Sequence, residues 1–74
     1  MKREQIKVGN KYTDNKGNIR EVLNIGSKFL LYSGQANNDC LRYKLIAKKR
    51  GPNPIGYVGN CTMIAFCSWA KKEV

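Results

Sequence analysis

The stretch from Cys40 to Lys49, CLRYKLIAKK, decides the fold of this chain. Apolar residues recur at every second position from Leu41 to Ala47, and basic residues alternate with them. This regular period of two predicts a β-strand with one face in the core and the other in solvent. Ile46 is the one apolar residue on the solvent face, which carries three cations: Arg42, Lys44 and Lys48.

Three shorter β-segments are expected before this strand. Residues 11–13 predict a strand, and Asp14 to Gly17 predict a hairpin turn, because Asp accepts backbone hydrogen bonds and Gly adopts positive φ. Residues 18–25 predict the next strand, in which Glu21 interrupts one apolar face; a bulge or a partly open edge would explain this. Residues 28–33 are apolar on both faces and predict a central strand, and residues 34–39 predict a polar loop.

The remainder of the chain predicts a loop, a last short strand and a helix. One glycine and two prolines in residues 50–54 are incompatible with a strand ladder, and residues 55–58 predict the last strand. Thr62 is a favourable helix N-cap. The apolar residues that follow have the spacing of one helix face, namely Phe66, Trp69, Ala70 and Val74.

These elements predict one small domain spanning residues 1–74, since 74 residues leave no room for a second. The β-rich part covers about residues 6–58, and the C-terminal helix about residues 62–73. We therefore expect a mostly β fold, a small SH3-like or OB-like five-stranded barrel capped by the helix.

The composition argues against an enzyme. The chain has no histidine, so a Ser-His-Asp triad, a Cys-His dyad and a His-ligated metal are excluded within it. Its three cysteines show no C-x-x-C spacing, and we expect reduced thiols and no metal. No phosphate-binding, dinucleotide-binding or hydrolase motif occurs, so we expect no catalytic residue and no cofactor. The charged N-terminal residues and the short apolar runs predict neither a secretory signal nor a membrane span.

The positive charge is the strongest indication of function. Fourteen Lys and Arg against five Asp and Glu give a net charge of +9, more than solubility requires. Cations on one side of a strand lie about 6.5 Å apart, close to the spacing of phosphates along a nucleic-acid strand. We expect these cations to bind phosphates and two tyrosines to stack on bases; the candidates are Arg20, Arg42, Lys44, Lys48, Lys49, Arg50, Tyr32 and Tyr57.

Other partners fit the same composition. An inhibitor or adaptor would dock on an acidic protein surface through these cations or through the loops at residues 34–39 and 51–56. A homodimer would form through the apolar segment 28–33 or a free sheet edge. The cations would otherwise serve only as a solvated face that resists aggregation.

The chain also resembles a group of small proteins encoded by bacteriophages and prophages, over about residues 7 to 74. The motifs that carry this resemblance are Val8-Gly9, Tyr12, Asp14, Gly17-Asn18, Arg20-Glu21-Val22, Asp39-Cys40, Arg42-Tyr43, Gly51-Pro52, Asn60-Cys61-Thr62, Phe66 and Trp69-Ala70. The resemblance implies an accessory role in a bacterial cytoplasm. It implies no activity and transfers no catalytic residue.

Overall fold

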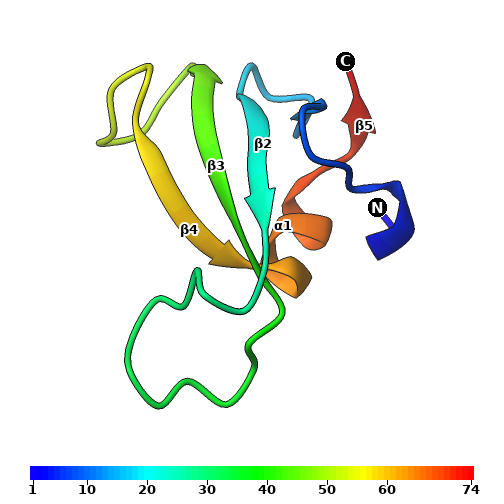
Figure 1. The fold of residues 1–74 in the computed structure, drawn as a ribbon. Coiled ribbons are helices and arrows are strands. Elements are labelled where there is room, and N and C mark those ends of the chain that lie inside the picture. Colours follow the sequence, from blue (N-terminus) through cyan, green and yellow to red (C-terminus); the bar gives the residue numbers. More distant parts are fainter.

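The computed structural model describes residues 1–74 and contains a single five-stranded antiparallel sheet, one α-helix and one 3₁₀-helix (Figure 1). The strands lie in the order β4-β3-β2-β1-β5. In chain order the elements are η1 (Arg3–Gln5), β1 (Lys11–Thr13), β2 (Ile19–Ile25), β3 (Cys40–Ala47), β4 (Val58–Thr62), α1 (Met63–Trp69) and β5 (Lys72–Glu73). The mostly β fold with five strands and a helix near the C-terminus is confirmed. The sheet is open, with β4 and β5 as its edges, so it does not show the expected closed barrel.

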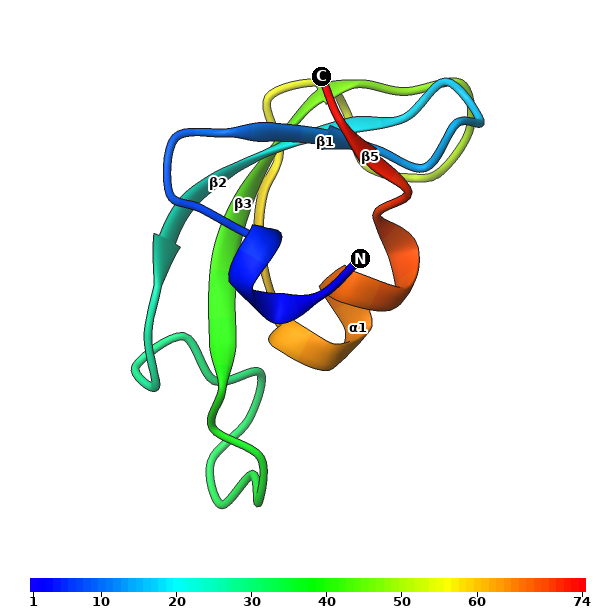
Figure 2. The same ribbon diagram turned by 90° about the vertical axis from the view of Figure 1, so that its right-hand side faces the viewer.

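The sheet curls around α1 and η1, which both lie on its concave side (Figure 2). We call this side the inner face and the opposite side the outer face. The core fills the inner face, where Tyr12 and Phe66 are fully buried and pack edge to face with ring centroids 5.7 Å apart. The complete core cluster is Ile6, Tyr12, Val22, Leu41, Met63, Phe66 and Ala70.

A bulge in β2 resolves the irregular pattern of that strand. Val22 pairs with Tyr43 and Asn24 with Arg42, so Leu23 is skipped in the register between β2 and β3. The extra residue turns both Val22 and Ile25 toward the inner face, and Val22 is fully buried. Of the two explanations left open by the sequence, the bulge is therefore the one observed.

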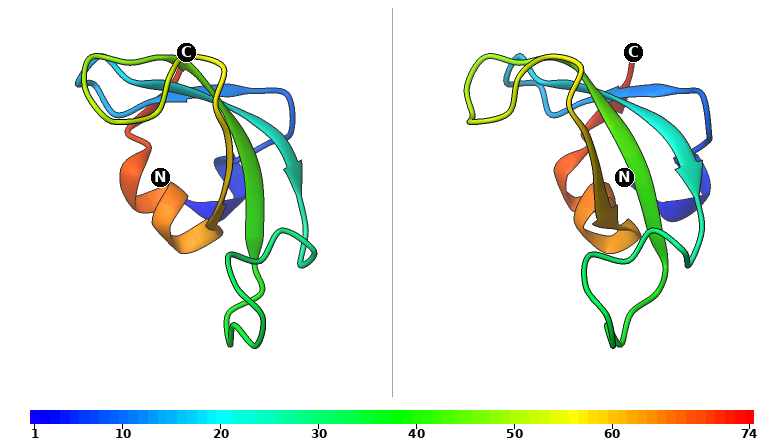
Figure 3. Two further views of the ribbon diagram at one scale, coloured as in Figure 1. Left: turned by 90° about the vertical axis from the view of Figure 1, so that its left-hand side faces the viewer. Right: turned by 60° about the vertical axis from the view of Figure 1, so that its left-hand side comes forward.

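The prediction of a central strand at residues 28–33 was wrong. These residues lie in turns within the long connection between β2 and β3, which extends beyond the end of the sheet (Figures 1 and 3). Only Phe29 is buried, against Gly26, whereas Leu31 and Tyr32 are 55% and 65% exposed. β2 and β3 pair directly with each other and leave no place for a strand between them. The strand expected at residues 55–58 also differs: it begins at Val58 and continues through Gly59 to Thr62.

The helix begins as expected and ends early. Thr62 is the N-cap, and its Oγ1 accepts a hydrogen bond from the amide of Ala65 at 3.1 Å. The predicted extension to residue 73 was wrong, because Ala70 is already extended, with φ −73° and ψ 130°. The amides of Lys71 and Val74 instead donate to carbonyls of β1, and β5 forms on that edge. Val74, expected to face the core, is 56% exposed.

Candidate nucleic-acid interface

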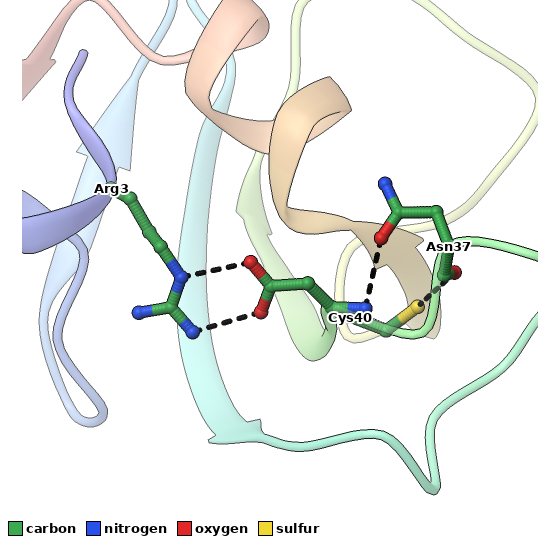
Figure 4. Close-up of polar contacts among 4 residues, drawn as sticks. Arg3, Asn37 and Cys40 are labelled. Atoms are coloured by element: carbon green, nitrogen blue, oxygen red, sulfur yellow. Dashed lines mark hydrogen bonds and ion pairs between the residues drawn. The ribbon is translucent and has the colours of Figure 1, made fainter.

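Almost none of the positive charge is neutralised within the chain. Arg3 forms the one ion pair, with Nε and Nη2 each donating to the Asp39 carboxylate at 2.8 Å (Figure 4). The hydrogen bonds from Arg3 hold the pKa of Asp39 below its usual range. The other thirteen lysines and arginines have no carboxylate within 4.0 Å, so no acidic side chain of the chain neutralises them.

Arg42 and Lys44 lie on the outer face of β3, as the alternation predicted. Arg42 lies between Asn24 and Asn60 in the neighbouring strands, and its Nε donates to the Asn60 side-chain oxygen at 3.0 Å. Its guanidinium carbon also lies 4.8 Å from the centre of the Phe29 ring. These contacts orient an exposed guanidinium, whereas the neighbouring Lys44 makes no side-chain hydrogen bond.

The next three cations lie beyond the strand, in the loop between β3 and β4. Lys48 does not project from a solvent face, because its Nζ donates to the carbonyls of Gly51 and Asn53 at 3.1 and 2.6 Å. Lys48 therefore closes the loop on itself. Lys49 and Arg50 are exposed.

This loop lies beside the turn between β1 and β2, at one end of the sheet (Figures 2 and 3). The amide of Lys49 donates to the Asn18 side-chain oxygen at 3.2 Å. A Cβ atom at Gly17 would lie 3.1 Å from the Cβ of Lys49, and Gly17 also has φ +89°. A glycine at this position therefore allows both the turn and the close approach of the loop.

The turn and the loop together form a hollow of about 540 Å³, which we call the turn–loop hollow. It is lined by three cations, two amide side chains and one glycine, with no apolar residue and no carboxylate: Asn15, Lys16, Gly17, Asn18, Lys49 and Arg50. The nearby Asp14 carboxylate accepts hydrogen bonds from Asn18 and from the amide of Lys16. Burial tends to raise the pKa of Asp14, but these hydrogen bonds outweigh it and lower that pKa.

Arg20 lies apart from Arg42 and Lys44. The sequence predicted that it would bind phosphates together with these cations, and its strand β2 does pair with β3. The register, however, sets Arg20 opposite Tyr12 and Leu45, on the inner face. There its guanidinium carbon lies 4.6 Å from the centre of the Tyr43 ring and 4.2 Å from that of Trp69.

The two candidate stacking residues are both exposed, in different surroundings. Tyr57 is 38% exposed, and its ring centre lies 6.4 Å from that of Tyr43. Tyr57 and Arg42 both line a shallow hollow of about 350 Å³ along β4. Tyr32 lies in the connection between β2 and β3 and does not line this hollow.

The cysteines form neither a disulfide nor a metal cluster. Burial raises the pKa of the Cys61 thiol to about 11, so this thiol is protonated at neutral pH. All three cysteines are free, and no three His, Cys, Asp or Glu side chains come together where they would hold a metal ion. None of the helices has both the length and the apolar character needed to cross a membrane.

The chain matches no family model, and no curated protein and no solved structure matches it. The resemblance to bacteriophage proteins therefore stays a prediction, and the function has to be argued from the geometry.

Proposed function

We propose that the protein is a small non-enzymatic module that binds the phosphate backbone of nucleic acids. The contacting residues form what we call the basic surface: Arg42 and Lys44 on the outer face of β3, and Lys16, Lys49 and Arg50 around the turn–loop hollow. The observation that carries this proposal is the hollow itself, where three cations meet without a carboxylate among its lining residues. Such a site is complementary to a polyanion.

The arrangement of the cations supports backbone contacts rather than reading of bases. Arg42 and Lys44 project from the same face of an extended strand, about 6.5 Å apart. No helix lies on the outer face that would enter a groove (Figure 2). Binding would therefore depend on counterion release, with little sequence preference. Tyr57, which lines the same shallow hollow as Arg42, would stack on an unpaired base.

Two parts of the proposal concern context. The curled five-stranded sheet covered by α1 supports a relationship to the small SH3-like or OB-like barrels. An accessory role for a bacteriophage in the bacterial cytoplasm rests on the sequence resemblance alone.

Binding of three labelled oligonucleotides over a salt series tests the proposal: single-stranded DNA, duplex DNA and single-stranded RNA, with heparin as a competitor. We expect tight binding that weakens steeply with salt and is strongest for a single strand. Weak binding, equal for all three and no better than for heparin, would contradict it. The alternative is that the same cations bind an acidic surface of another protein. A protein partner that stays bound after nuclease treatment of a bacterial lysate would support that alternative.

A further inference from the structure

Arg20 has a positive charge for which the fold supplies no partner. Its guanidinium makes no hydrogen bond and no ion pair within the chain, and its Nε is buried without an acceptor. The adjacent Glu21 points to the outer face, opposite Lys44. A buried donor without an acceptor is costly, and the stacking rings compensate for it only in part.

Arg20 also lines a small pocket formed with the β3–β4 loop. Its volume is about 130 Å³, and it is lined by Asn18, Arg20, Leu45, Arg50, Gly51, Pro52 and Asn53. Two arginines and two asparagines therefore line a space of about four water volumes. That space suits a tetrahedral anion with little water and is too small for a nucleoside.

The pocket is held in shape before any ligand arrives. Tyr43 and Trp69 hold the Arg20 guanidinium between their rings. The Lys48 ammonium fixes the loop through the carbonyls of Gly51 and Asn53, which both line the pocket. Preorganised donors lower the entropic cost of binding, and the planar guanidinium matches the oxygens of a phosphate group.

We propose that this pocket binds one phosphate group, with Arg20 and Arg50 as its charged ligands. This group is either the terminal phosphate of a nucleic-acid strand or free inorganic phosphate. The first source rests on the proposed function, since Asn18 and Arg50 also line the turn–loop hollow, where the rest of a strand would lie. The second source does not depend on it.

Trp69 allows a direct test, because it is the only tryptophan of the chain and stacks on Arg20. The protein is titrated with inorganic phosphate at constant ionic strength, and tryptophan emission is recorded. We expect a saturable change that Arg20→Gln abolishes and that Arg50→Gln, in an exposed loop, weakens about tenfold, as for the loss of one charge-assisted contact. Lys72→Gln removes the same charge from the exposed edge strand β5 and should leave the titration unchanged.

Two oligonucleotides of one sequence, with a 5′-phosphate or a 5′-hydroxyl, distinguish the sources. If the phosphorylated strand binds more tightly and Arg50→Gln removes that difference, the ligand is the terminal phosphate of a strand. If inorganic phosphate changes the emission and the two oligonucleotides bind equally, the ligand is free phosphate. If neither oligonucleotide binds while inorganic phosphate still changes the emission, the proposed function fails and the pocket stands. The pocket is refuted if neither inorganic phosphate nor the phosphorylated strand changes the emission, or if Arg50→Gln and Lys72→Gln weaken the response equally.

Discussion

Replacing Arg42 and Lys44 together by glutamine should lower the salt dependence of binding to single-stranded DNA by about two fifths. Five backbone contacts, one from each cation of the basic surface, give a slope of log affinity against log salt of about −3.5, at ~0.7 per phosphate. Affinity should then fall about 130-fold between ~50 and ~200 mM salt. With two contacts removed, the slope becomes about −2.1 and the fall about 20-fold.

The assay is fluorescence anisotropy of a labelled oligonucleotide at several salt concentrations. Lys71→Gln combined with Lys72→Gln is the matched control, because it removes the same charge near the other edge of the sheet, where β5 lies. The control should keep the original slope. A common slope for both double variants would refute the reasoning, since binding would then follow net charge and not these contacts. The melting temperature of each variant shows that the fold is retained.

Four further predictions concern the fold and its ionisable groups. Tyr12→Phe should cost about 2 kcal/mol in urea unfolding, because the buried hydroxyl bonds two backbone groups of the 5–7 segment; an unchanged midpoint would contradict this. Thr62→Ala removes the N-cap bond and should cost about 1 kcal/mol, whereas Thr62→Ser should restore it, both measured by the same unfolding. Hydrogen bonds from Arg3 lower the pKa of Asp39, so the stabilisation by this carboxylate is present above the unfolded pKa of about 4 and is lost as the pH falls through the lower folded value. Asp39→Asn should therefore flatten the acid side of a plot of melting temperature against pH, and a plot parallel to that of the unaltered protein would exclude this. Cys61, with a pKa of about 11, should be alkylated by iodoacetamide at pH 8 far more slowly in the folded protein than in urea, as mass spectrometry would show; equal rates would mean that the thiol is not buried.

The elements that the sequence predicted well are those with a local physical cause. The alternation from Leu41 to Ala47 places one face in the core wherever the strand pairs, so β3 was recognisable by itself. The turn at Asp14 to Gly17 and the cap at Thr62 depend on hydrogen bonds to nearby backbone, which residue type alone indicates.

The elements that were missed depend on distant partners. Residues 28–33 have the composition of a buried strand, but β2 and β3 already pair with each other, and the segment is left outside. β5 exists because β1 offers a free edge at the point where the chain leaves α1. No local pattern in Lys72–Glu73 predicts this strand, and the helical spacing of the apolar residues continues past it to Val74.

The residues of the candidate site also divide into those with a local cause and those that depend on distant partners. Alternation along one strand was enough to place Arg42 and Lys44 on the outer face. The position of Arg20 depended on the register across two strands, and that of Lys48 on the loop that it closes. Lys16 was not predicted as a site residue, because only the folded chain brings its turn beside Lys49. Its position next to Gly17 in a predicted turn was the one signal in the sequence that could have indicated it.

The most direct test of the basic surface is a map of amide chemical-shift changes when a short single-stranded oligonucleotide is added to ¹⁵N-labelled protein. We predict that the largest changes fall on β3 around Arg42 and Lys44, and on the turn and loop that carry Lys16, Lys49 and Arg50. Changes confined to α1 and β5, or none at saturating oligonucleotide, would contradict the proposal that these cations form a nucleic-acid interface.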